Sequence, residues 1–118
     1  MIEKITLSNK TNKRFDITMN SGKIYSFGLK DGSTYIDHHD KILRSAYWAR
    51  HYANGTEKQL ILNLVPSPAL FSAFILWGKY THINDNIKYL NKLWKQKHAN
   101  ETLDTIKSFF TIDKKLQK

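Results

Sequence analysis

The N-terminal third of the chain alternates apolar and polar residues. Phe15, Ile17 and Met19 are each separated by one polar residue, which is the period of a half-buried β-strand. An Asn-Ser-Gly turn and a second aromatic-rich segment at 24–27 follow. This order predicts a β-hairpin of residues 15–19 against 24–27.

Apolar residues at 2, 5 and 7 indicate a short first strand, and Gly22 can supply the positive φ of the turn. Gly28 and the Lys-Asp-Gly-Ser cluster at 30–33 are expected to end the hairpin. The rest of the chain has the period of helices. Expected helices run from 37 to 53, from 68 to 78, from 81 or 84 to 98, and from 100 to 110, with a loop or short strand at 60–65. Asn54-Gly55 is interpreted as a helix stop, and Ser67-Pro68 as an N-cap followed by a first-turn proline.

These elements predict an α+β fold, in which an N-terminal antiparallel β-hairpin or three-strand sheet packs on three to four short helices. One small basic domain spans residues 1–118, with the sheet at about 1–28, the helical part at about 37–110 and a frayed tail at 111–118. The expected core contains Phe15, Ile17, Ile24, Phe27, Tyr47, Leu70, Phe74, Trp77, Ile87, Leu90 and Trp94.

Composition narrows the function classes. The chain of 118 residues has no cysteine, which excludes a disulfide scaffold, a cysteine zinc site and a thiol nucleophile. Its 19 basic and 10 acidic residues give a net charge of +9. The charge lies in two lysine-rich ends, net +4 over residues 1–30 and net +5 over 79–118, around a neutral middle. Such ends are suited to diffuse attraction toward something acidic.

The expected helix at 37–53 carries a polar stripe. Asp40, Arg44, Tyr47 and His51 follow one another at spacings of four, three and four, which places them on one helical face. With Arg50 they form either a structural polar network that locks the helix against the hairpin, or a phosphate or ligand site. We favour the structural network, because no second carboxylate accompanies the basic groups.

No catalytic, cofactor or metal site is expected. The strongest metal candidates are His38, His39 and His51, but the first two are adjacent and would point about 100° apart on a helix. Neither a nucleophile motif around a serine nor a glycine-rich phosphate loop is present. A phosphodiester-cleaving enzyme using Arg50 and His51 is the residual enzymatic alternative.

The basic ends supply candidate contacts to an acidic partner or nucleic acid: Lys13, Arg14, Lys23, Lys88, Lys92 and Lys95. Tyr25, Phe27 and Trp48 are candidates for stacking on bases, although their periods favour burial in the core. Residues 59–78 lack charge, but two prolines interrupt them, so no transmembrane segment is expected. Neither is a secretory signal expected, whereas contact with a membrane surface stays open.

The order Gly-Lys-x-x-x-Phe-Gly at 22–28, His-x-Asp at 38–40, Tyr-x-x-Arg-His at 47–51 and Leu-Trp at 76–77 resembles a small uncharacterised domain family of nucleocytoplasmic large DNA viruses. The resemblance covers about residues 13–94 and brings no catalytic residue. It implies a non-enzymatic structural protein, most simply a minor capsid or virion protein. Such a protein would contact the major capsid protein, other virion proteins or an internal membrane, first in the host cytoplasm and then in the virion. The alternative is a virion protein that binds DNA or RNA without sequence preference.

Overall fold

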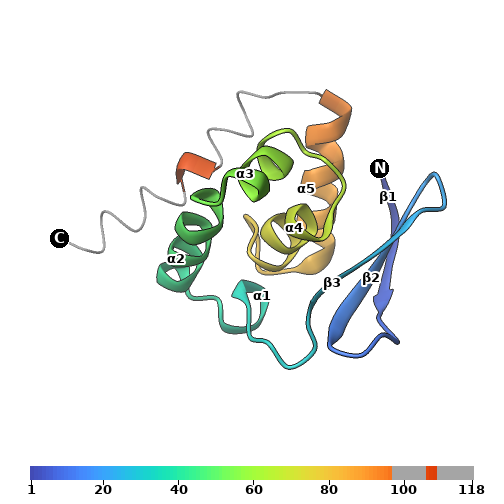
Figure 1. Ribbon diagram of the computed structural model, residues 1–118, viewed down its shortest axis with the longest axis horizontal. Helices are drawn as coiled ribbons and strands as arrows, with labels where there is room; N and C mark the ends of the chain where they lie inside the picture. The colour runs from blue at the N-terminus through green and yellow to red at the C-terminus, as the bar shows by residue number, and fades with distance from the viewer. Residues whose placement is uncertain (97–105, 109–118) are drawn as a thin grey trace.

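A computed structural model describes residues 1–96 and 106–108 and places a three-stranded antiparallel sheet beside a group of short helices (Figure 1). The elements are β1 (Ile2–Leu7), β2 (Lys13–Met19), β3 (Ile24–Leu29), α1 (Tyr35–His38), α2 (Lys41–Tyr52), α3 (Gly55–Leu62), α4 (Pro68–Phe71), a π-helical turn (Ser72–Leu76) and α5 (Ile83–Gln96). The predicted α+β class and N-terminal sheet are confirmed. Residues 106–108 are helical, whereas the rest of the helix expected at 100–110 and the tail at 111–118 lie outside the described residues.

The sheet has the order β1-β2-β3, and the predicted hairpin is its β2–β3 half. Phe15 stands opposite Phe27 in this pair, and Gly22 closes the turn with a φ of 91°. β3 ends at Leu29, directly before the 30–33 cluster as expected, but Gly28 lies within the strand. Gly28 has a φ of 79°, and a Cβ there would meet Leu76 at 3.0 Å, so the glycine allows the strand to approach the helical layer closely.

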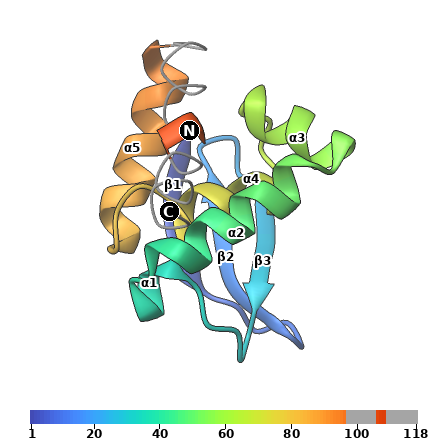
Figure 2. The same cartoon turned by 90° about the vertical axis from the view of Figure 1, so that its left-hand side faces the viewer.

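The helices lie on one side of the sheet (Figures 1 and 2). Phe15, Ile17 and Phe27 are buried against them, as predicted, together with Tyr47, Leu70, Phe74 and Leu90. Ile24 was wrongly expected in the core. Its side chain is 58% exposed because it stands beside the β2–β3 turn, outside the Phe15–Ile17–Met19 face. The predicted core residues Trp77, Ile87 and Trp94 are half-buried.

One helix was expected over 37–53, but the structure has two. His39 adopts a left-handed conformation (φ 57°) and ends α1, and Asp40 begins α2 by accepting hydrogen bonds from the backbone N–H groups of Ile42 and Leu43. A separate capping box, formed by Thr34 and Asp37, starts α1. In this box the Asp37 carboxylate accepts a hydrogen bond from the Thr34 N–H at 2.8 Å. Local side-chain caps therefore override the continuous helical period.

The expectation for 54–65 is only partly confirmed, because α2 ends at Tyr52 and residues 63–65 form a loop, but the segment between them is a helix. The Asn54 side chain caps α3 by accepting from the N–H groups of Thr56 and Glu57 at 3.1 Å, so Asn54-Gly55 starts a helix instead of only ending one. Asparagine is as good an N-cap as it is a stop signal. The segment read as a loop or strand is helical up to Leu62, with Ile61 buried.

The helix expected from 68 to 78 begins as predicted but ends differently. Ser67 accepts from the Leu70 N–H, and Pro68 occupies the first turn. After Phe71 the backbone widens into the π-helical turn, which ends at Leu76, and the Trp77 N–H donates to the Ser72 carbonyl at 3.1 Å. A π-helical turn of this kind often accompanies a functional surface.

Asn86 of α5 secures the end of that turn. Its side chain is 1% exposed, donates to the carbonyls of Ile75 (2.8 Å) and Tyr80 (2.9 Å), and accepts from the Tyr80 N–H. Gly78 fits beneath it, because a Cβ at this position would lie 1.9 Å from the Phe74 carbonyl oxygen. The reversal between the π-helical turn and α5 is therefore tightly packed around a glycine and a buried amide.

Gly78→Ala is predicted to lower the free energy of unfolding by about 3 kcal/mol or more, because the new methyl group must displace backbone. Gly55→Ala is the matched control, since a Cβ there meets nothing within 4 Å and is expected to change stability by less than about 1 kcal/mol. Urea unfolding followed by tryptophan fluorescence measures both. Equal midpoints for the two variants would contradict the packing described here.

Candidate functional site

The polar stripe predicted on α2 joins this helix to several different neighbours. Arg44 is 4% exposed, and its guanidinium lies 4.5 Å from the centre of the Tyr35 ring and donates to the carbonyls of Gly78 (3.1 Å) and Lys79 (3.4 Å). Burial lowers the pKa of this guanidinium. Arg44 therefore links α1, α2 and the segment that follows the π-helical turn, while Asp40 is an exposed cap.

Tyr47 and His51 belong to a run of stacked rings. Tyr47 lies parallel to Trp77 (ring centres 4.5 Å apart, 6° between planes), and the His51 ring lies 4.1 Å from Tyr47. His38 covers Trp77 at 5.3 Å. Burial raises the pKa of the Tyr47 hydroxyl, and the nearby Glu57 carboxylate raises it further. The hydroxyl is thus a neutral group in a packed contact.

Nδ1 of His51 also lies within hydrogen-bond distance of the Glu57 carboxylate of α3. Arg50, the remaining member of the predicted network, is exposed. Three of the five residues therefore attach α2 to other parts of the fold. Arg44 contacts α1 and the segment after the π-helical turn, Tyr47 contacts Trp77, and His51 contacts α3. Whether they act together to lock the fold stays a prediction.

A pocket of about 410 Å³ opens between β3, the β3–α1 loop, α2 and the π-helical turn. Its polar rim includes Lys13 and Arg50, and its apolar wall includes Leu29, Leu76 and Trp77. Sequence analysis singled out Tyr47, Arg50, His51 and Trp77 in separate arguments, and the fold brings all four to this pocket. We call it the β3–α2 pocket.

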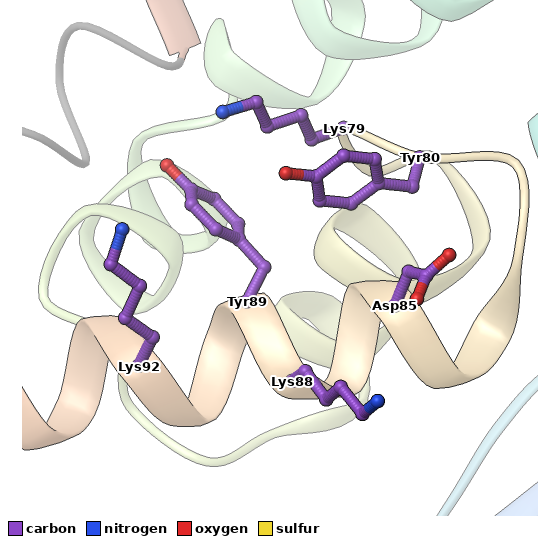
Figure 3. A pocket seen from close by; sticks show the side chains of 6 residues that line it. All are labelled: Lys79, Tyr80, Asp85, Lys88, Tyr89 and Lys92. Carbon is purple, nitrogen blue, oxygen red and sulfur yellow. The ribbon is translucent and has the colours of Figure 1, made fainter.

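A second surface follows α5, where two adjoining hollows of about 440 and 530 Å³ share Lys88 and Lys92. Side chains of Lys79, Tyr80, Asp85 and Tyr89 line the first hollow (Figure 3), and Lys95 lines the second with Met1 and Asn91. We call the lysines and tyrosines of both hollows the α5 surface: Lys79, Tyr80, Lys88, Tyr89, Lys92 and Lys95. The predicted trio of α5 lysines is thus brought together.

The α5 surface combines charge with aromatic rings. The Lys79 ammonium lies 4.8 Å from the Tyr89 ring centre and 5.6 Å from that of Tyr80, and Lys92 lies 5.9 Å from Tyr89. In Figure 3 these four side chains are grouped along one side of α5, whereas the amine of Lys88 points away from them. Asp85 is the single carboxylate among the described residues that line the two hollows.

The other predicted basic contacts lie elsewhere. Arg14 donates two hydrogen bonds, of 2.6 and 2.7 Å, to the Asp37 carboxylate, so its positive charge is paired within the fold. Lys13 lines the β3–α2 pocket, and Lys23 lies 5.3 Å from the Tyr25 ring centre at the β2–β3 turn. The six residues are therefore divided among at least three places.

Sequence reasoning missed Lys79 and Tyr80, which come from the segment between the π-helical turn and α5. They reach Tyr89 because Asn86 holds the backbone of Tyr80 against α5, which no helical period indicates. Tyr89 itself was detectable, since it lies three residues before Lys92 on the same helix.

The aromatic residues considered for base stacking are mostly in the core. Phe27 is 1% and Trp48 0% exposed, and the Trp48 indole N–H donates to the Trp77 carbonyl at 2.7 Å. Burial, the favoured interpretation, is confirmed for these two. Tyr25 is half-buried with its ring edge-on to Phe71.

Within residues 1–96 and 106–108, no three histidine, aspartate or glutamate side chains lie close enough to hold a metal ion. His38 packs on Trp77 and accepts at Nδ1 from the Asp40 N–H (2.9 Å). None of the described helices is long and apolar enough to cross a membrane.

Comparison with known proteins finds a family match for part of the chain. Residues 3–51, which are less than half of it, match the model of a family of unknown function, DUF5754. The match spans the sheet, α1 and most of α2, and therefore one side of the β3–α2 pocket, but it does not reach α5. No curated protein matches the chain, and no solved structure matches it.

Asp37→Asn is predicted to reduce stability by about 1 kcal/mol at pH 7, because it weakens both the Arg14 pair and the α1 cap. The Arg14 hydrogen bonds hold the pKa of Asp37 well below its usual range, so the carboxylate stabilises the fold above the unfolded-state pKa of about 4. Its contribution is lost as the pH falls through the folded-state pKa.

Urea unfolding of wild type and Asp37→Asn between pH 7 and pH 2 tests this, and the two curves should converge toward the acid end. Asp31→Asn, at an exposed position, should follow wild type throughout. A stability difference that stays constant down to the lowest pH would show that the charge of Asp37 is unimportant.

Proposed function

We propose that this chain is a non-enzymatic structural protein of a large DNA virus, a minor capsid or virion protein that uses the α5 surface to bind an acidic partner. The observation that supports this proposal best is the convergence of Lys79, Lys88, Lys92 and Lys95 on two adjoining hollows, whose described lining residues include one carboxylate. The viral assignment rests on the sequence resemblance described above. The partner is the major capsid protein, another virion protein or the anionic headgroups of an internal membrane.

The chemistry of the α5 surface suits adhesion to an acidic face. Its cationic groups are lysine ammonium ions on flexible stems, which attract carboxylates and phosphates without the fixed geometry of a guanidinium fork. The exposed side of α5 is secured from behind by Leu90 and Leu93, which are fully buried. A rigid helix with a lysine face supports association by charge complementarity, which controls encounter and specificity.

A second candidate function is sequence-independent binding of DNA or RNA in the virion. Tyr80 favours it, because this residue is 41% exposed with Lys79 beside its ring, and an exposed aromatic ring beside a cation can stack on a base. Electrostatic binding of this kind weakens steeply with salt, in proportion to the number of phosphates neutralised. The dependence of affinity on salt therefore separates the two candidates.

Mass spectrometry of purified virions, with and without their genome, tests the proposed role. The chain is expected in both, whereas loss with the genome would select the nucleic-acid function and absence from both would reject a virion role. Replacing both Lys88 and Lys92 by Glu should lower its occupancy in particles by about tenfold. Lys41→Glu, an exposed change on α2, serves as the control.

Fluorescence anisotropy with a labelled DNA duplex completes the test. A capsid component should bind the duplex weakly at about 150 mM salt, near physiological ionic strength. Affinity that stays strong there and falls linearly with salt on logarithmic axes would favour the nucleic-acid function. The Lys88→Glu/Lys92→Glu variant should then lose affinity and show a shallower slope than Lys41→Glu.

A further inference from the structure

The β3–α2 pocket shares no lining residue with the α5 surface and has a different chemistry. Three walls enclose it. The first wall consists of Gly28 and Leu29 of β3 and the loop that leads to α1. Arg50 and His51 of α2 form the second wall, and Leu76 and Trp77 form the third. Its volume of about 410 Å³ lies within the range of pockets that accept ligands.

The aromatic rings of this pocket already stack on one another. Trp77 stacks on Tyr47 and lies 5.3 Å from the ring centre of His38, while Tyr47 also contacts the His51 ring. These rings are therefore already engaged with one another, which leaves less ring surface for a nucleotide base. The wall that remains for an occupant is aliphatic, from Leu29, Leu76 and Pro68, and suits a branched apolar side chain.

The charge of the pocket is of one sign. Lys13 and Arg50 line it, both are exposed, and none of the described residues that line it is an aspartate or glutamate. Within the described residues, neither of these two cations has an ion-pair partner. The neighbouring Arg14 is neutralised by Asp37, so the positive charge available to an occupant comes from Lys13 and Arg50.

The pocket also lies against a sheet edge. β3 is the last strand of the order β1-β2-β3, and Leu29 at its end is 71% exposed. An edge strand offers backbone groups with which an extended peptide can pair, while adjoining pockets select its side chains. This position favours a peptide over a compact small molecule.

We propose that the β3–α2 pocket binds an extended acidic segment of a partner protein. An apolar side chain of that segment enters the aliphatic wall formed by Leu29, Leu76 and Pro68. Flanking aspartate or glutamate side chains contact Lys13 and Arg50. This site is separate from the α5 surface, so it stands or falls independently of the proposed virion role.

Selection of a random-peptide display library on the full chain tests the proposal. Enriched peptides are expected to combine a leucine, isoleucine or valine with adjacent acidic residues. A labelled peptide of the enriched sequence should then bind about tenfold more weakly to Lys13→Glu/Arg50→Glu. Ser33→Trp, which places a bulky ring at an exposed lining position, should block binding without entering the core.

Matched variants define the outcomes. Lys41→Glu and the Lys88→Glu/Lys92→Glu pair should bind the peptide as wild type does. Circular dichroism and urea unfolding should show that every variant is folded. The proposal is overturned if no acidic-apolar peptide is enriched, or if pocket variants and controls bind it equally. It is also overturned if adenosine monophosphate, and not the peptide, shifts the NMR signals of Gly28, Gly32 and the Trp77 indole.

Discussion

The rest of the structure depends on burying the apolar segment from Leu70 to Leu76. Apart from Ser72, its side chains are at most 2% exposed. A helix that is apolar all round must be enclosed on every side, and the sheet, α2 and α5 enclose this one (Figure 1). Because this segment is buried, the unpaired backbone groups at its two ends need hydrogen-bond partners. The Ser67 hydroxyl accepts from the Leu70 N–H at the start, and the Asn86 side chain donates to the Ile75 carbonyl at the end.

Both candidate surfaces are consequences of this enclosure. The π-helical turn sets Ser72 and Trp77 where they meet Tyr47, and this contact together with β3 forms the pocket. On the other side, α5 covers the segment with its apolar face and leaves its lysines outward. The Asn86 amide then brings Tyr80 beside them. The sites therefore rest on well-packed elements, which is the arrangement that holds binding groups in place.

The fold also sorts the basic residues by their chemistry. Arg14 and Arg44 hold parts of the chain together, through a carboxylate in one case and through backbone carbonyls and a tyrosine ring in the other. A planar guanidinium makes several directed hydrogen bonds at once and suits such internal roles. The lysines in the described part of the chain remain on the surface, so the charge presented there to a partner is mainly a lysine charge, with Arg50 as the exposed arginine on α2.

The amino-acid sequence by itself determined the strand period of residues 15–19, the turn at Gly22, the Ser67-Pro68 helix start and the shared face of the α5 lysines. All of these depend on neighbours within a few residues. The three-dimensional structure revealed that Asp40 and Asn54 begin helices, although both do so through local caps, and that Gly28 remains within a strand. It also decided that Lys79 and Tyr80 join α5. Each of these outcomes is a competition between local signals of similar strength, and contacts with distant residues such as Leu76 and Asn86 accompany two of them.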